Sequence, residues 1–223
     1  FFGEEGLCSE GSGDSCIPYP GVIDFLGQLN EVLKNGLCYG FSAASTNIFD
    51  NTVAIGSFDT KAENTFDLKR TEIVERTIAR WHMLQFTEEF RDEIDKYISL
   101  SPVEIAKDLK QTFDSYEQKS IPPMTLALYA SNGGHSVTPV SVEQVNDGYL
   151  IHVYDSNWPG KSRHVRVGDD GKWMYQGGHQ NPEEASGAWS ESGPGTMALI
   201  PHSLLGSTFK CFFCEKPSEK MEG

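Results

Sequence analysis

The order of two hydrophobic periodicities predicts an α+β fold. Between residues 21 and 113, apolar side chains recur every three or four positions, which is the spacing of amphipathic helices. From Met124 onward, apolar and polar side chains alternate in short runs separated by Gly- and Asp-rich turns, as in antiparallel strands. Helices followed by antiparallel strands are typical of an α+β domain, so we expect N-terminal helices and then a twisted antiparallel β-sheet.

The helical half divides at recognisable boundaries. Asn35-Gly36 separates a first helix over residues 21–34 from a second over residues 38–49, whose small side chains favour close packing. Two apolar stripes follow over residues 73–84 and 86–98. The segment Ser101-Pro102-Val103-Glu104 combines a capping box with proline at the first helical position, and it predicts a helix that continues through Phe113.

The second half predicts strands at residues 124–130, 136–145, 149–154, 163–167, 172–175 and 197–201. The segment Asn146-Asp147-Gly148 indicates a hairpin turn between the second and third of them. Residues 176–195 are rich in Gly, Pro, Ser and Glu, and we expect a long loop there.

The cysteines outline the domain organisation. Cys8 and Cys16 lie in a Gly/Ser-rich arm over residues 1–20, and Cys211 and Cys214 lie in a tail over residues 206–223. A single domain over residues 21–205 holds the fifth, Cys38. We expect disulfides in the arm and the tail, because the Cys-x7-Cys spacing is wider than that of a zinc knuckle; a four-thiolate zinc site is the alternative. Disulfides imply an oxidising compartment and hence a secreted or periplasmic protein.

The charge balance bears on possible partners. The chain carries 32 acidic and 18 basic side chains, a net charge of −14. A nucleic-acid partner requires a basic stripe that displaces counterions, so this composition argues against one. The chain has no run of about 18 apolar residues, and we therefore expect no membrane span.

Cys38 is the strongest candidate for a reactive group. It follows Asn35-Gly36-Leu37 and begins a predicted helix. A helix N-terminus and a neighbouring imidazolium both lower the pKa of a thiol, and the thiolate is its nucleophilic form. A small, buried and inert cysteine is the ordinary alternative, so the choice depends on the residues that could act with Cys38.

We expect His135 and Asp155 to act with it. His135 follows a Gly-Gly pair and opens an apolar strand, a setting that the other five histidines lack. Asp155 closes the next strand, where its carboxylate would hold the imidazole in the required tautomer. Asn157 is the competing residue, because a register centred on Asp147 opposes His135 with residue 159 and so favours the later position. A β-bulge would bring Asp155 into line.

This arrangement resembles the papain-like cysteine peptidases, including their bacteriocin-processing branch. The Gly133-Gly134-His135 segment and the strand that ends in Asp155 are similar to that branch, and Asn157-Trp158 is similar to the Asn-Ser-Trp element of papain. The resemblance covers roughly residues 35–158. It implies a papain-like fold and a cysteine hydrolase that cleaves a peptide, isopeptide or other amide bond in a peptide or protein substrate, with no cofactor and no metal.

Two positions depart from the family pattern. Val32 stands six residues before Cys38, where these families usually carry a glutamine that stabilises the oxyanion, and Tyr39 replaces the tryptophan of the papain Cys-Trp pair. The oxyanion donors would then be the Cys38 backbone N–H and a second amide, for which Asn35 is the nearest candidate. Three alternatives stay open: an inactive papain-like binding domain, a transglutaminase-type acyl transferase that uses the same three residues, and a structural secreted domain with an inert Cys38.

Overall fold

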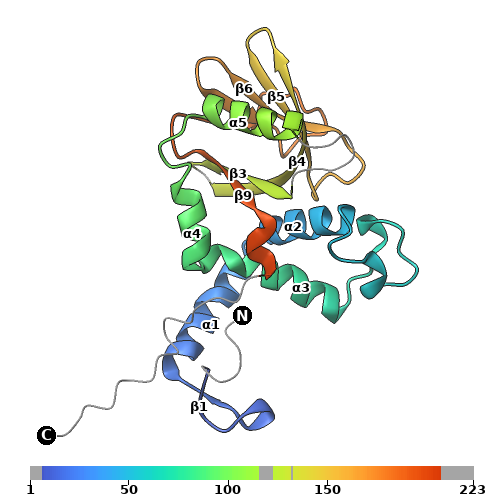
Figure 1. Ribbon diagram of the computed structural model, residues 1–223, viewed down its shortest axis with the longest axis vertical. Coiled ribbons are helices and arrows are strands. Elements are labelled where there is room, and N and C mark those ends of the chain that lie inside the picture. Colours follow the sequence, from blue (N-terminus) through green and yellow to red (C-terminus); the bar gives the residue numbers. More distant parts are fainter. Residues whose placement is uncertain (1–6, 116–122, 132, 207–223) are drawn as a thin grey trace, which may run out of the picture. The chain divides into compact units, whose positions relative to one another are not determined.

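The computed structural model describes residues 7–115, 123–131 and 133–206, and the chain divides into two compact units. The first unit comprises Phe1–Gly36 with Gly206–Gly223, and the second comprises Leu37–Leu205. The boundary in the structure therefore follows the first long helix, whereas the sequence pattern placed it after residue 20. The ribbon in Figure 1 shows the elements of both units.

The first unit contains a short hairpin and one helix. Strand β1 (Cys8–Glu10) pairs antiparallel with β2 (Ile17–Pro18), and the 3₁₀ turn η1 (Gly13–Ser15) joins them. Cys8 and Cys16 form a disulfide across this hairpin, as expected for the arm. Helix α1 (Pro20–Leu33) follows with proline at its first position, where its missing N–H has no partner to lose.

The second unit begins with its helices. These are α2 (Cys38–Phe49), α3 (Glu72–Met83), α4 (Glu88–Asp95) and α5 (Pro102–Ser115), with 3₁₀ turns η2 (Ile55–Ser57), η3 (Thr65–Asp67), η4 (Leu84–Phe86) and η5 (His202–Gly206). Thr71 and Thr87 cap α3 and α4 by accepting hydrogen bonds from first-turn N–H groups. At α5 the predicted capping box is present, since Glu104 accepts from the Ser101 N–H and Ser101 Oγ accepts from the Glu104 N–H.

A seven-stranded antiparallel sheet forms the rest of the second unit, which confirms the α+β class. Its strands are β3 (Met124–Ala130), β4 (Gly133–Val145), β5 (Gly148–Tyr154), β6 (Arg163–Gly168), β7 (Lys172–Tyr175), β8 (Trp189–Ser192) and β9 (Met197–Pro201). Their order is β8-β7-β6-β5-β4-β3-β9. The expectation of an unbroken loop over residues 176–195 was wrong, because β8 lies within it and pairs with β7. Two serines at alternate, exposed positions hid this strand among loop-forming residues.

The sheet curls so that its two ends approach each other around a core. The backbone N–H of Ser131, just after β3, donates to Oε1 of Glu191 in β8 at 2.9 Å, and Trp173 Nε1 donates to Thr196 Oγ1 at 3.1 Å. Helix α5 packs against the apolar side of this sheet, as Figure 1 shows. Its residues Ile105 and Leu109 are completely buried among the apolar side chains of β3 to β7 and β9.

Helix α2 covers the opposite side of β3 and β4. Successive residues of β3 point to the two faces of the sheet. Leu126 packs with α5 on one face, and on the other face the Thr125 hydroxyl contacts Ser42 Oγ of α2 at 3.0 Å. The same Ser42 hydroxyl contacts Thr138 Oγ1 of β4 at 2.7 Å. These buried hydroxyls join α2 to the sheet by polar contacts in place of large apolar side chains. They fix the position of the helix that begins with Cys38.

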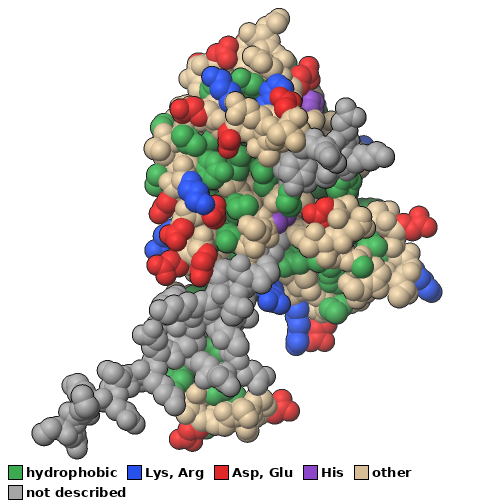
Figure 2. Space-filling view, in the orientation of Figure 1, with side chains coloured by type: hydrophobic (Ala, Val, Ile, Leu, Met, Phe, Trp, Pro, Cys, Tyr) green, Lys and Arg blue, Asp and Glu red, His purple; other side chains and the backbone are tan. Residues whose placement is uncertain are grey.

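Close packing on α3 fixes the other side of α2. A Cβ added to Gly40 would lie 2.2 Å from the carbonyl oxygen of Ile78, so only glycine fits at this crossing. On the face drawn in Figure 2, acidic side chains spread over the second unit and the Lys and Arg side chains stand among them. Within the described residues, no helix is long and apolar enough to cross a membrane.

Candidate functional site

Cys38 occupies the first position of α2. The N-cap residue is Leu37, whose side chain accepts no hydrogen bond from the first turn, so the first N–H groups of the helix have no side-chain cap. Gly36 before it has φ of 125°, which other residues rarely adopt. The free Cys38 thiol is half-buried at this end of the helix, where the partial positive charge of the helix dipole favours the thiolate.

His135 lies near the beginning of β4 and interacts with the Cys38 thiol closely enough to lower the pKa of the thiol, while Cys38 in turn raises the pKa of the imidazole. Its ring is 9% exposed. Nε2 of the ring contacts the Asp155 carboxylate, so Nδ1 is the nitrogen that remains for the sulfur. Gly133, with φ of 146°, allows the chain to enter the strand immediately before the histidine. The structure therefore brings together the cysteine and the histidine singled out in the sequence, which are 97 positions apart.

Asp155 follows the last residue of β5 and accepts a hydrogen bond from His135, with 2.9 Å between Nε2 and Oδ2. A bulge between Pro139 and Ser141 shifts the register of β4 and β5 by one residue. The pairing of the two strands ends with Thr138 opposite Tyr154. The chain then leaves the sheet, and the Asp155 carboxylate reaches back to the histidine. Asp155 is 1% exposed.

Asn157 contacts the same carboxylate through its backbone. Its N–H donates to Asp155 Oδ1 at 2.8 Å, while its side chain is exposed. The structure thus brings the Asp155 side chain to His135 and directs the Asn157 side chain to solvent. Both residues are part of one turn, which the hydrogen bond from the Trp158 N–H to the Asp155 carbonyl closes at 2.9 Å.

Tyr175 and Trp189 complete the surroundings of the Asp–His pair. The Tyr175 hydroxyl donates to Asp155 Oδ2, the same oxygen that faces the histidine. The Trp189 ring meets the imidazole edge to face, with 5.9 Å between the ring centroids. Sequence reasoning missed both residues. The alternating pattern of Trp173 and Tyr175 marked β7 as half-buried, but no local signal indicated which strand end meets Asp155.

Arg163 and Trp158 brace the turn that carries Asp155. The guanidinium of Arg163 stacks on the Trp158 ring, 3.9 Å from its centroid, and Trp158 Nε1 donates to the Gly177 carbonyl at 2.8 Å. Arg163 is 1% exposed, and within the described residues its Nε and Nη2 have no hydrogen-bond partner. Its Nη1 donates to the Gln176 carbonyl at 3.5 Å, so this hydrogen bond and the cation–π contact together hold the buried charge.

The electrostatics of the site favour a thiolate–imidazolium pair. Burial raises the pKa of Cys38, but the hydrogen bond and the charge of His135, followed by hydrogen bonds from Ser136, outweigh it and lower that pKa. Burial lowers the pKa of His135, yet Asp155 and Cys38 together raise it to about 9. For Asp155, burial raises the pKa, and contacts with His135, Tyr175 and Asn157 bring it below its usual range. Cys38 thus loses its proton at a lower pH than a free thiol, and His135 keeps its proton to a higher pH than a free imidazole.

Ser136 is a further contact of the sulfur that the sequence pattern did not suggest. Its backbone N–H and its hydroxyl both lower the pKa of Cys38, after the larger contribution of His135, and so favour the thiolate. Ser136 is 7% exposed and directly follows His135. Consecutive residues of β4 thus reach Cys38 from the two sides of the strand, since successive strand residues point to opposite faces.

The remaining predicted site residues have other contacts or lie outside the described residues. Asn35 belongs to the first unit, where its amide contacts the Glu31 carbonyl at 3.5 Å. The disulfide between Cys8 and Cys16 leaves neither sulfur as a thiolate ligand for zinc. The expected second bridge falls on Cys211 and Cys214, which are outside the described residues. Among the residues that are described, His, Cys, Asp and Glu form no group of three that could hold a metal ion.

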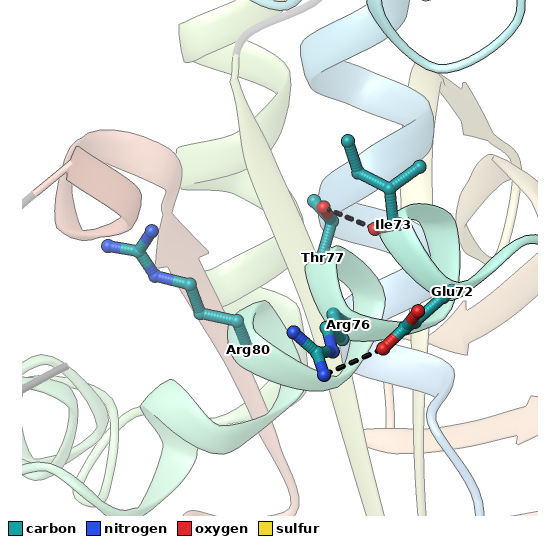
Figure 3. A pocket seen from close by; sticks show the side chains of 5 residues that line it. All are labelled: Glu72, Ile73, Arg76, Thr77 and Arg80. Carbon is teal, nitrogen blue, oxygen red and sulfur yellow. Dashed lines mark hydrogen bonds and ion pairs between the residues drawn. The ribbon is translucent and has the colours of Figure 1, made fainter. Parts of the chain in front are cut away.

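Two surface pockets lined by described residues lie away from Cys38. One, of about 450 Å³, lies on α3 and is shown in Figure 3; its lining residues are Glu72, Ile73, Arg76, Thr77 and Arg80. Glu72 and Arg76 form an ion pair of 2.7 Å there, and the Thr77 hydroxyl donates to the Ile73 carbonyl. The other, of about 460 Å³, adjoins the turns at Asp147 and Asp169. Neither contains a nucleophile beside a base.

Comparison with known proteins gives no match: no protein-family model, no curated protein and no solved structure matches the chain. Inference about function therefore depends on the contacts of Cys38, His135 and Asp155.

Proposed function

We propose that this chain is a cysteine hydrolase of papain-like type that cleaves a peptide or other amide bond in a peptide or protein substrate. The observation that carries the proposal is the hydrogen bond between His135 and Asp155, together with the mutual influence of Cys38 and His135 on each other's pKa. In this proposal Cys38 is the nucleophile, His135 is base and then acid, and Asp155 orients the imidazole.

The same arrangement supports a papain-like fold as part of the proposal. A helix that begins with the cysteine packs on an antiparallel sheet, and adjacent strands of this sheet supply the histidine and the acid. The Cys8–Cys16 disulfide supports an oxidising compartment, as in secreted or periplasmic proteins.

The proposed reaction proceeds through a thioester. The Cys38 thiolate adds to the substrate carbonyl carbon, and the negative charge moves to the carbonyl oxygen. As the tetrahedral species collapses, the C–N bond breaks and the His135 imidazolium gives its proton to the departing amine. Neutral His135 then takes a proton from water as the water oxygen attacks the thioester. The C–S bond breaks, the acid product leaves, and the thiolate–imidazolium pair is restored.

An amine in place of water would make the same site an acyl transferase. The described contacts of Cys38 and His135 serve both reactions equally, because the two differ only in the acceptor of the acyl group. An inactive binding domain is the alternative that Val32 favours, since valine cannot donate a hydrogen bond to an oxyanion. Reactivity of Cys38 separates the enzymatic proposals from the binding domain.

The test is the rate at which iodoacetamide alkylates Cys38 at about pH 6, measured by peptide mass mapping and compared with free cysteine. We expect alkylation at least about tenfold faster than that of free cysteine, because a thiol with a lowered pKa retains thiolate at this pH. His135→Ala should abolish this advantage and Cys38→Ala should abolish turnover of a peptide mixture. Labelling of folded wild-type protein no faster than free cysteine would overturn the proposal and favour the binding domain.

A further inference from the structure

Tyr129 of β3 lies beside the residues that hold the Cys38 sulfur. It pairs with Gly134 of β4, the residue before His135 and Ser136. A Cβ added to Gly134 would lie 3.6 Å from Cδ1 and 4.0 Å from Cε1 of Tyr129. These are ordinary van der Waals distances, so the ring lies over Gly134, next to the two residues that lower the pKa of Cys38.

Strand alternation directs Tyr129 toward α2. Residues 125, 127 and 129 share one face of β3, and on that face the Thr125 hydroxyl contacts Ser42 of α2. Cys38 begins the same helix. The electrostatics agree with this placement, because burial and then the charge on Cys38 raise the pKa of Tyr129 to about 12. Its hydroxyl is therefore a proton donor at neutral pH, close to where negative charge resides.

The site otherwise lacks a second oxyanion donor among its described contacts. Val32 carries no donor, and the Asn35 amide contacts the Glu31 carbonyl. The Ser136 hydroxyl is engaged with the sulfur itself. The Cys38 backbone N–H, which is free of a side-chain cap, supplies one donor at the helix N-terminus.

We propose that the Tyr129 hydroxyl is the second oxyanion donor of this site, in place of the glutamine that papain-like peptidases carry where this chain has Val32. The assignment rests on the proposed cysteine hydrolase function. When the thiolate adds to the carbonyl, negative charge leaves the sulfur for the carbonyl oxygen, and the Tyr129 hydroxyl donates a hydrogen bond to that oxygen. No proton is transferred in this step, so the phenol remains neutral throughout.

Tyr39 provides an independent observation on this side of the site. It is completely buried, and within the described residues its hydroxyl has no hydrogen-bond partner. Such a group in a protein interior calls for a physical explanation. Its pKa is raised first by burial and then by the charge of Tyr129. The two phenols are therefore electrostatic neighbours beside Cys38, and no hydrogen bond joins them in the described residues.

The test compares two reactions of Cys38 that differ in forming an oxyanion. Acylation by p-nitrophenyl acetate passes through a tetrahedral oxyanion, whereas alkylation by iodoacetamide does not. In Tyr129→Phe we expect the acylation rate to fall about 100-fold, the effect of removing one oxyanion donor, while the alkylation rate changes less than about twofold. Tyr149→Phe is the matched control, because it removes a phenol hydroxyl at the far end of β5. It should leave both rates unchanged.

Other outcomes separate this assignment from the proposed function. Equal losses in both reactions would mean that Tyr129 acts on the thiolate, and no loss in acylation would mean that it does not act; either result overturns the assignment. Slow alkylation of the wild-type protein would instead overturn the hydrolase proposal itself. If circular dichroism shows that Tyr129→Phe does not fold, 3,5-difluorotyrosine at position 129 retains the ring and ionises at lower pH. Acylation alone should then fall as the pH rises, and parallel profiles for the two reactions would refute the assignment.

Discussion

Replacing Asp155 by asparagine isolates the contribution of its charge. An amide of the same shape still accepts a hydrogen bond from Tyr175, but it cannot stabilise an imidazolium by charge. The pKa of His135 rises from 6.5 to about 9 despite burial, and the hydrogen bond with Asp155 is the largest of the contacts that raise it. At about 1.36 kcal/mol for each pKa unit, the shift corresponds to about 3 kcal/mol.

We assign about half of that energy to Asp155, since the Cys38 thiolate also contributes to the shift. The loss of about 1.5 kcal/mol makes the thiolate–imidazolium pair about tenfold less populated at the same pH. The two pKa values move in opposite directions. Without the carboxylate the pKa of His135 falls, and with less imidazolium the pKa of Cys38 rises. The pH range over which the ion pair exists therefore narrows from both ends.

The measurement is the pH profile of Cys38 alkylation by iodoacetamide. In Asp155→Asn we expect the profile to move to higher pH and the rate at about pH 6 to fall about tenfold, with a loss of turnover by orders of magnitude. Asn157→Ala is the matched control, because it keeps the backbone N–H that contacts Asp155 and removes only an exposed amide. If Asn157→Ala moves the profile and Asp155→Asn does not, the orienting role belongs to Asn157 and our reasoning is refuted.

Three predictions concern stability. Burial lowers the pKa of His202 to about 4, so between pH 6.5 and pH 4 the unfolded chain binds a proton there and the folded chain does not. The contribution of neutral His202 to the free energy of unfolding is therefore fully present above pH 6.5. It falls by about 3 kcal/mol as the pH drops through 4. Burial also lowers the pKa of His82 to about 4, so His202→Gln should remove about half of the dependence of Tm on pH in this range, and an unchanged slope would contradict the assignment. Gly40→Ala should destabilise the second unit by about 2 kcal/mol or more, because its Cβ would meet a carbonyl oxygen of α3 at 2.2 Å. Gly56→Ala, which meets open space, is the control, and equal urea midpoints for the two variants would argue against this crossing. Reducing the Cys8–Cys16 disulfide should destabilise the first unit by about 2–3 kcal/mol. Faster hydrogen exchange of the α1 amides after reduction would detect this loss, and unchanged protection of α1 would contradict it.

The elements that the sequence predicted best are those in which local pattern and tertiary environment agree. Strand β3 and helix α2 have the predicted bounds, since a short apolar run marks one and Gly36 interrupts the chain before the other. Strand β8 was missed because its burial comes from pairing with β7, and Gly, Pro and Ser surround it in the sequence. Local composition therefore outweighed a contact that only the folded sheet supplies.

The site shows the same division. Cys38, His135 and Asp155 each end or begin an element, and such positions are visible in a sequence. After the one-residue bulge in β4 the register would oppose His135 with residue 157, so register alone still favoured Asn157. Asp155 reaches the histidine because β5 ends at Tyr154 and the chain leaves the sheet there, which has no clear compositional mark. Ser136 and Tyr175 were not predicted because their roles arise where strand ends converge, and the contact from Tyr175 to Asp155 joins strands that are not neighbours in the sheet.

The curl of the sheet has a consequence for when Cys38 becomes reactive. Its partners come from β4, the turn after β5, and β7, so the chain must be synthesised beyond Tyr175 before the last of these contacts forms. Contacts between residues so distant in sequence form late, since long loops must close first. A ribosome-bound chain that exposes only the helices would thus carry an ordinary, largely protonated thiol. The Cys38 thiol of nascent and misfolded copies is then unreactive, and it becomes a reactive thiolate only in the completed sheet.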